Sequence, residues 1–209
     1  MLSFFYKIKN AYIYKTSSFR KNKLISTDFS IISNNCWGGM VYKSYNLPYL
    51  SPTVGCFFMA HDYIKFLSNI QEYMSKDLSF ISVNESKWKE YFENDIDYPI
   101  GKLDDIEIFF VHYYSQKEVL EKWNRRRDRI NWENLVIKVS EQNGFSKEHL
   151  DTFNSLNFQK KIAFIGNDYS VGKNVLRVTN LENGKKDIDI NEEPRIGKKI
   201  IDFLNERQN

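Results

Sequence analysis

Short apolar runs of β-type residues alternate along the chain with amphipathic segments of helical periodicity, and this alternation restricts the fold more than any other feature. Strands are expected over 28–33, 78–83, 106–113, 134–139 and 161–165, with a hairpin over 174–190. Helices are expected over 2–22, 63–75, 115–129, 146–156 and 196–205. Alternating strands and helices are typical of an α/β layered fold with a mainly parallel sheet.

The length and composition of the chain match one folded domain. Of the 209 residues, 42% are hydrophobic and 27% are charged, which is enough apolar material for a core and excludes the disordered class. We therefore expect residues 1–209 to form a single α/β domain, in which a basic amphipathic helix over 1–24 precedes the core. That helix either packs on its own domain or lies on a membrane surface.

Several other classes of protein are disfavoured by simple counts. The two cysteines do not make a disulfide framework for a chain of this length. No stretch of 18 apolar residues is present, and the N-terminal segment lacks the apolar run and the cleavage site of a signal peptide. A net charge of +3 gives no support for nucleic acid as a partner. We expect a cytoplasmic protein.

The loop after the strand over 28–33 is the first candidate site, since ligands of α/β folds bind beyond the carboxyl ends of strands. Cys36 is a candidate nucleophile, with Ser33 as a replacement. Trp37 offers a ring on which a sugar or base can stack. The remaining candidates, Asn34, Gly38 and Gly39, offer polar groups and a backbone that a ligand can approach closely. The alternative is a buried thiol beside an ordinary turn.

The segment 104–113 is the second candidate site. Asp105 and Glu107 are two residues apart on an expected strand, so they point to the same face and suit a Mg²⁺ or Mn²⁺ ion or acid–base chemistry. His112 follows as a candidate base. The alternatives are a solvated acidic edge for the carboxylates and a core histidine for His112.

The expected helix over 115–129 supplies the third candidate site. It begins with the capping-box spacing of Ser115 and Glu118 and ends in a cluster of cations. Arg126 and Arg129 share a helical face with Lys122, which predicts a clamp for a diphosphate, and Asn131 follows as a further binding candidate. The alternative is that these cations only complement the dipole of the helix C-terminus.

Four segments together resemble a known family, the bacterial family numbered 1919 among the domains of unknown function. The segments are 31–39, 50–58, 98–107 and 112–131, within a match that covers residues 25–205. Members of this family are labelled exopolysaccharide biosynthesis proteins. The resemblance implies a three-layer α/β/α fold with a mixed, mainly parallel sheet and a place in capsule or exopolysaccharide gene clusters, without established catalytic residues. The matching positions are Ser33, Asn34, Cys36, Trp37, Gly38, Gly39, Ser51, Pro52, Asp104, Asp105, Glu107, His112, Trp123, Arg126 and Asn131.

Three functions are consistent with these residues and the resemblance. The first is a glycosyltransferase that uses a nucleotide-diphosphate sugar and a glycan acceptor, which a lipid can carry. The second is an acyltransferase with Cys36 or Ser33 as nucleophile and His112 as base. The third is a glycan- or partner-binding module without catalysis. A cleft shared by Asp105, Glu107 and Arg126 favours the first function, and a contact between Cys36 and His112 favours the second.

Overall fold

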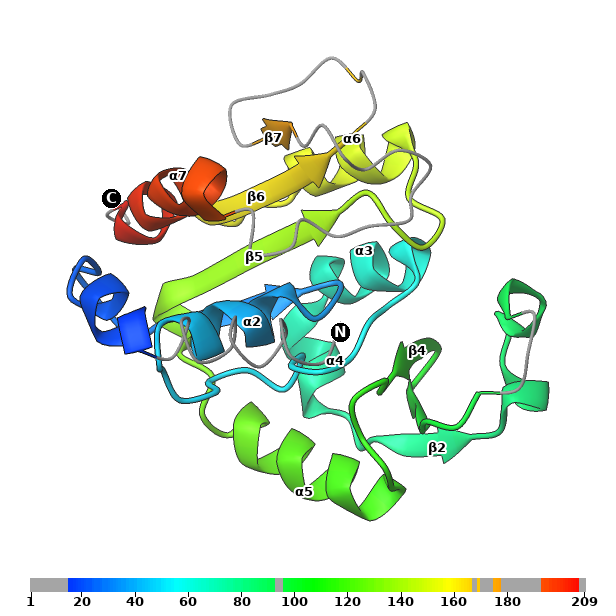
Figure 1. Ribbon diagram of the computed structural model, residues 1–209. Helices are drawn as coiled ribbons and strands as arrows, with labels where there is room; N and C mark the ends of the chain where they lie inside the picture. The colour runs from blue at the N-terminus through cyan, green and yellow to red at the C-terminus, as the bar shows by residue number, and fades with distance from the viewer. Residues whose placement is uncertain (1–14, 93–95, 167–168, 170–174, 178–192, 207–209) are drawn as a thin grey trace, which may run out of the picture.

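A parallel sheet of four strands forms the centre of the molecule. The computed structural model describes residues 15–92, 96–166, 169, 175–177 and 193–206. The strand order is β1-β5-β6-β7, and all neighbours run parallel (Figure 1). The strands are β1 (Ser30–Ser33), β5 (Leu135–Ser140), β6 (Lys160–Ile165) and β7 (Val175–Arg177). The strands β1, β5 and β6 are almost fully buried, as expected for a parallel sheet that is covered on both faces.

Helices cover both faces of this sheet and complete a three-layer α/β/α fold. One apolar cluster joins α2 (Trp37–Ser44) and α7 (Glu193–Asn205) to Ile31, Val136 and Phe164 of the sheet. A second cluster joins α3 (Ala60–Ser68), α4 (Ile70–Ser75) and α6 (Lys147–Ser155) to the neighbouring sheet residues Ile32 and Ile137. Successive residues of each strand thus serve opposite faces of the sheet.

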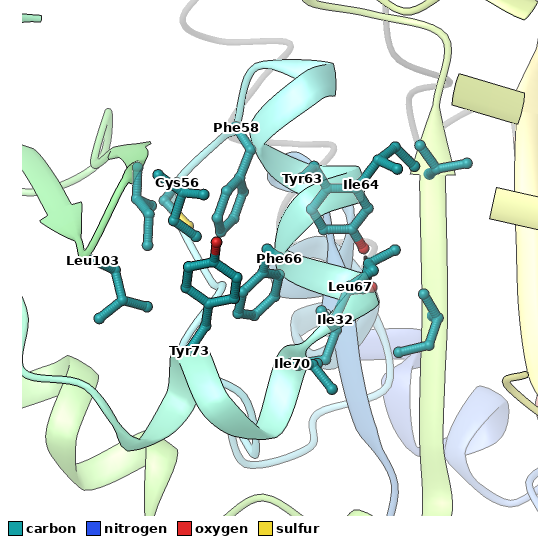
Figure 2. Packing of buried hydrophobic residues seen from close by; sticks show 14 of the residues in the cluster. Ile32, Cys56, Phe58, Tyr63, Ile64, Phe66, Leu67, Ile70, Tyr73 and Leu103 are labelled. Atoms are coloured by element: carbon teal, nitrogen blue, oxygen red, sulfur yellow. Dashed lines mark hydrogen bonds between the residues drawn. The ribbon is translucent and has the colours of Figure 1, made fainter. Parts of the chain in front are cut away.

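Aromatic rings form much of the second cluster. Figure 2 shows Phe58, Tyr63 and Phe66 grouped together, and the Phe58 and Phe66 rings stack with their centroids 5.4 Å apart. The Tyr63 hydroxyl lies 2.9 Å from the Ile32 carbonyl oxygen and 2.8 Å from that of Lys138. One phenol therefore anchors α3 to both β1 and β5.

A smaller antiparallel sheet lies beside the central one. Its order is β2-β3-β4, with β2 (Ser79–Ile81), β3 (Ile100–Leu103) and β4 (Ile106–Phe109). Asp104 has a φ of 58° in the turn between β3 and β4, a conformation that Asp and Asn adopt more readily than most residues. Two short 3₁₀ helices, Val83–Glu85 and Lys89–Tyr91, follow β2.

A buried carboxylate holds the segment after β2 against this smaller sheet. Asp62 of α3 is fully buried and accepts hydrogen bonds from Lys87 Nζ at 2.6 Å and from Trp88 Nε1 at 2.8 Å. It also accepts one from the Glu107 N–H of β4 at 3.0 Å. Burial of a charge is tolerated only with such partners. Asp62 therefore lies in the first turn of α3 as a tertiary anchor, not as the N-cap, which is Met59.

The helix α5 (Gln116–Arg127) begins as its capping box predicts and lies next to the β1 edge of the sheet (Figure 1). The Ser115 hydroxyl accepts the Glu118 N–H at 3.2 Å, and the Glu118 carboxylate accepts the Tyr114 N–H at 3.1 Å. The short helix η3 (Trp132–Asn134) then leads into β5. No helix within the described ranges is both long and apolar enough to span a membrane.

Several elements differ from the expectations. The strand expected over 106–113 ends at Phe109, and the helix expected over 63–75 is broken at Asn69, whose φ of −141° is not helical. Residues 37–44, expected as a loop, form α2, and β3 was not expected at all. The strand β7 pairs parallel with β6, while the rest of the expected hairpin lies outside the described residues. Of the expected N-terminal helix only residues 15–22 are described, and 15–21 of these are helical.

Candidate functional site

A cavity of about 340 Å³ lies between α2 and α5 at the β1 edge of the central sheet. The residues that α2 and its N-cap contribute are Cys36, Gly39, Met40 and Lys43. The connection from α2 to α3 contributes Tyr49, Val54 and Gly55. The turn after β4 and the helix α5 contribute His112, Tyr113, Lys122 and Arg126. The loop after Ser33 and the segment after β4, two of the predicted site segments, therefore face one cavity.

Arg126 is the central cation of this cavity. Its side chain reaches back from the last turn of α5, and the residue is only 6% exposed. Its Nη1 donates to the Tyr113 hydroxyl at 2.6 Å and to the Val54 carbonyl oxygen at 3.4 Å. The guanidinium also lies over the Tyr49 ring, 4.8 Å from its centroid, a favourable cation–π arrangement.

The other edge of the Arg126 guanidinium has no partner among the described residues. Its Nε and Nη2 atoms make no hydrogen bond there, and no carboxylate of the described ranges forms an ion pair with it. Neither atom belongs to the fully buried side-chain atoms that lack a partner, so both keep some solvent-accessible surface, and Arg126 lines the cavity. This edge presents two parallel N–H groups, which match the oxygens of a phosphate or a carboxylate.

A glycine and a tyrosine fix the position of Arg126. Gly55 has a φ of 79°, and a Cβ at this position would lie 3.0 Å from Cε2 of Tyr113. The Tyr113 hydroxyl donates in turn to the Val54 carbonyl oxygen, while burial raises the pKa of this phenol to about 12. Because the ring packs on the Gly55 backbone, the hydroxyl that accepts from Arg126 is held in place.

Close packing explains the two glycines at the start of α2. A Cβ on Gly38 would lie 3.0 Å from Cγ2 of Ile31, and one on Gly39 would lie 2.9 Å from Cγ1 of Val54. The glycines thus allow α2 to pack closely against β1 and against the segment that contains Val54. They form the start of a helix and not the turn that was expected at these positions. The first turn of α2, which includes Gly39, therefore borders the cavity.

Cys36 and His112 are the two groups of the cavity with reactive side-chain atoms. Cys36 is the N-cap of α2, and its Sγ lies 3.8 Å from the Cys56 carbonyl oxygen. His112 is exposed and lies in the turn that follows β4, three residues beyond Phe109, where the strand expected over 106–113 ends. Its imidazole forms no hydrogen bond with a described residue. An imidazole in this state can accept a proton from a ligand hydroxyl.

Lysine side chains add to the positive charge of the cavity. Lys122 lies one turn before Arg126 on α5, forms an ion pair with Glu118, and lies over the Tyr113 ring at 5.3 Å from its centroid. Lys43 approaches from the last turn of α2. With Arg126, three cations line a space that no carboxylate lines among the described residues. The cavity is therefore suited to an anion.

Asp105 and Glu107 do not share a site. Asp105 lies in the turn before β4, where its carboxylate accepts hydrogen bonds from Lys65 and from the Tyr73 hydroxyl, the latter at 2.7 Å. These two partners, Lys65 first, hold the pKa of the Asp105 carboxyl below its usual range. Asp105 is outside the strand, so the period of two does not apply to the pair.

The Glu107 carboxylate is buried against the segment that follows β2. It is 4% exposed and accepts the Lys87 N–H at 3.0 Å together with the Ser86 hydroxyl. Neither Asp105 nor Glu107 lines the cavity, and the described residues contain no group of three His, Cys, Asp or Glu side chains placed to hold a metal ion. The Mg²⁺ or Mn²⁺ ion expected at this pair does not fit these residues.

Residues at the end of β1 have structural partners. The Ser33 hydroxyl, fully buried, donates to the Asn35 carbonyl oxygen and accepts the Gly38 N–H, so it is no substitute for Cys36 as nucleophile. Asn34 donates to the Ser140 carbonyl oxygen at 3.0 Å and accepts the Ser140 N–H at 2.8 Å.

Trp37 does not present a stacking face to the cavity. It is 2% exposed and packs edge to face on Phe164 in the core, with the ring centroids 5.4 Å apart. A residue in this position belongs to the interface between α2 and the sheet. The loop selected from the sequence borders the cavity, but the tyrosine rings that line the cavity are those of Tyr49 and Tyr113.

Two further candidates lie outside the cavity. Arg129 is exposed and follows the end of α5, where the helical face that it was expected to share no longer exists. Asn131 binds the start of the sheet: its side chain donates to the Asp28 carbonyl and carboxylate oxygens, and its N–H donates to the Ser30 hydroxyl at 2.8 Å. Of the predicted clamp, Lys122 and Arg126 remain.

Comparison with known proteins places the chain in a family. The sequence model of the domain of unknown function DUF1919 matches residues 7–206. The chain belongs to the DUF1919 family. An uncharacterized protein of Haemophilus influenzae (strain ATCC 51907 / DSM 11121 / KW20 / Rd) is 31% identical over 183 residues, which are 85% of this chain and 83% of that protein. The resemblance based on the four sequence segments is thereby confirmed.

Sequence reasoning missed several cavity residues of this DUF1919 protein. Tyr49 and Gly55 lie in the segment between α2 and α3, which carries no charge cluster and no glycine motif. The signal that was available is Gly55 itself, a glycine between apolar residues, which often marks a close backbone contact. Nothing in the sequence pairs Tyr49 with Arg126, because 76 intervening residues separate them.

Proposed function

We propose that this DUF1919 protein is a cytoplasmic transferase of surface-polysaccharide assembly, which takes a sugar from a nucleotide-diphosphate donor. The observation that supports the proposal most strongly is the buried Arg126 guanidinium, whose Nε–Nη2 edge faces a cavity without a carboxylate partner among the described residues. An unpaired buried cation is costly. A bound phosphate that accepts both N–H groups offsets this cost and explains why the cation is there.

The remaining charges of the cavity fit a second phosphate better than a lone carboxylate. Lys122 and Lys43 lie on either side of the space, on α5 and α2. Together with Arg126 they supply three cationic groups, of which Lys122 is also paired with Glu118, and a diphosphate carries two to three negative charges. A diphosphate is also the leaving group of sugar transfer, so the same contacts would stabilise the charge that develops on it.

His112 is the group with which we propose that the acceptor is activated. In the step, the acceptor hydroxyl oxygen forms a bond to the anomeric carbon while the bond from that carbon to the donor phosphate breaks. The nucleoside diphosphate leaves with the electron pair, and the hydroxyl proton passes to the His112 imidazole. The free imidazole at the exposed side of the cavity suits this role, because an acceptor enters from solvent.

A second candidate function is favoured by one observation: Cys36 and His112 line the same cavity. In an acyltransferase, the Cys36 thiol would attack the carbonyl carbon of an acyl donor and give up its proton to His112. The leaving group would take that proton, and the acceptor hydroxyl would then receive the acyl group from the thioester. Arg126 would hold a phosphate of coenzyme A.

Calorimetry with a panel of donors tests both candidates. The panel contains UDP-glucose, UDP-N-acetylglucosamine, GDP-mannose and coenzyme A, titrated into wild type, Arg126→Lys and Arg125→Ala. We expect a nucleotide sugar to bind wild type, and Arg126→Lys to weaken binding by about 10- to 100-fold, the equivalent of losing a charge-assisted bidentate contact. The exposed Arg125 on the same helix controls for the loss of one positive charge.

The outcomes separate the alternatives. Binding of coenzyme A alone, lost in Arg126→Lys, replaces sugar transfer by acyl transfer, and Cys36→Ala would then abolish labelling by a radioactive acyl-coenzyme A. A failure of all four ligands to bind, or equal affinities in wild type and Arg126→Lys, contradicts the phosphate site. Thermal melts of each variant establish that the fold is retained.

A further inference from the structure

Beside the cavity, one aromatic side chain is almost completely exposed. Tyr114 directly follows Tyr113, is two residues from His112, and is 96% exposed, more than any other large hydrophobic residue among those described. Single exposed aromatics are common on protein surfaces. Tyr114 differs from such residues in its attachment, because its N–H is bonded to Glu118 and its neighbours His112 and Tyr113 line the cavity.

The attachment of Tyr114 involves α5 and the cavity wall. The Tyr114 N–H donates to Oε2 of Glu118 at 3.1 Å, and Glu118 also pairs with Lys122, a cavity residue. Lys122 and the Tyr114 N–H hold the pKa of the Glu118 carboxyl below its usual range, so this carboxylate stays ionised. The backbone of Tyr114 is thus bonded to Glu118, which pairs in turn with Lys122 at the cavity.

Three residues of α5 at intervals of four, Arg126, Lys122 and Glu118, form a row from the cavity toward solvent, and Tyr114 precedes the N-cap of the helix. Arg126 is 6% exposed, the side chains of Lys122 and Glu118 are 34% and 28% exposed, and Tyr114 is 96% exposed. Such spacing places neighbours on one side of a helix. The ten helical steps from Gln116 to Arg126 extend about 15 Å along the helix axis, a distance of more than one sugar ring.

We infer that Tyr114 is a stacking platform for the acceptor glycan, which reaches His112 over the Glu118–Lys122 pair. This inference rests on the proposed function, because it assigns the acceptor side of the same site. The occupant follows from the chemistry of the row. A flat apolar ring packs on the C–H face of a pyranose, while an adjacent carboxylate and ammonium accept and donate hydrogen bonds with sugar hydroxyls.

Saturation-transfer NMR with cellobiose and maltose tests the inference on the full chain. Both disaccharides are neutral, so binding does not depend on the phosphate site. We expect one of them to bind wild type, the affinity to fall at least fivefold in Tyr114→Ala, and Tyr114→Trp to retain it. Tyr91→Ala is the matched control, because Tyr91 is another exposed tyrosine, 51% exposed, and does not line the cavity.

The same samples separate this inference from the proposed function. A thermal shift with pyrophosphate reports the Arg126 site, and we expect Tyr114→Ala to retain that shift while Arg126→Lys loses it. If neither disaccharide binds wild type, or if Tyr114→Ala binds as wild type does, the acceptor platform is wrong even when the pyrophosphate shift is present. If the pyrophosphate shift is absent in wild type, the donor site fails independently of Tyr114.

Discussion

The guanidinium of Arg126 and the hydroxyl of Tyr113 are joined by a hydrogen bond of 2.6 Å. The bond uses one edge of the guanidinium and leaves the other directed to the cavity. Tyr113 therefore fixes the orientation of the Nε–Nη2 edge of Arg126. Tyr113 itself is buried, with 5% of its surface exposed.

Tyr113→Phe should weaken the binding of pyrophosphate while the protein remains folded. The ring still packs on Gly55, but Arg126 loses its short hydrogen bond and its orientation. A hydrogen bond to a charged group contributes about 1.5–3 kcal/mol, so we expect an affinity loss of about tenfold or more by calorimetry. Tyr45→Phe is the control, since it removes the hydroxyl of a buried tyrosine that does not line the cavity. Equal pyrophosphate affinity in Tyr113→Phe and wild type would show that Tyr113 does not position Arg126.

Gly55→Ala and Gly144→Ala form a matched pair. Both glycines have nearly the same positive φ, 79° and 80°, so both substitutions carry the same backbone strain of about 1–2 kcal/mol. Only at Gly55 does the new Cβ meet Tyr113, at 3.0 Å, whereas at Gly144 the nearest atom is 4.0 Å away. We expect Gly55→Ala to be the less stable variant in urea unfolding and the one that loses pyrophosphate binding. Equal effects of the two substitutions would contradict the close contact.

Glu107→Gln should lower stability and leave ligand binding unchanged. Glutamine keeps the shape of the side chain but not the negative charge, to which the Ser86 hydroxyl and the Lys87 N–H donate hydrogen bonds. We expect a loss of about 1–2 kcal/mol in the free energy of unfolding, measured with urea. Pyrophosphate affinity should equal that of wild type, because Glu107 lies outside the cavity. A stable Glu107→Gln variant that no longer binds the ligand would return this carboxylate to the functional site.

Alkaline pH should destabilise the protein in a way that Tyr113 explains in part. Burial raises the folded-state pKa of Tyr113 to about 12, whereas the unfolded value is about 10. A raised pKa means that the folded state binds the proton more tightly, so the contribution to stability is complete below pH 10 and is lost between about pH 10 and 12. In urea unfolding over this range, Tyr113→Phe should show a shallower decline than wild type. Parallel declines in both proteins would contradict the assignment.

The alternation of periodicities was sufficient for the layers and for most elements of the central sheet. The strands β1, β5 and β6 are buried along nearly their whole length, as in a parallel sheet that is covered on both faces. The helix α2 was missed because two adjacent glycines favour a turn on local grounds. Their conformation is decided by tertiary packing against Ile31 and Val54, which no local rule contains.

The candidate site was located more reliably than its members were assigned. Cys36, His112 and Arg126 do meet at one cavity, since their segments follow strand ends or lie on the adjoining helix. The spacing of Asp105 and Glu107 in the sequence does not reveal whether the two carboxylates bind a ligand or form hydrogen bonds with other residues of the protein. The structure shows such internal partners for both of them. The partners of Glu107, Ser86 and Lys87, lie 21 and 20 residues away, and such pairings emerge only from the fold.

The side chain of Asn34 takes the place of one more residue of β1. Its amide bonds both the N–H and the carbonyl oxygen of Ser140, groups that main-chain atoms of a longer β1 would otherwise bond. The backbone is thereby released one step early and can turn into α2 without leaving β5 unsatisfied. A carboxylate lacks the donor, so aspartate would be a poor substitute at this position despite its similar shape. The segment that carries Cys36 is in this way held by hydrogen bonds to β5 as well as by its chain connection to β1.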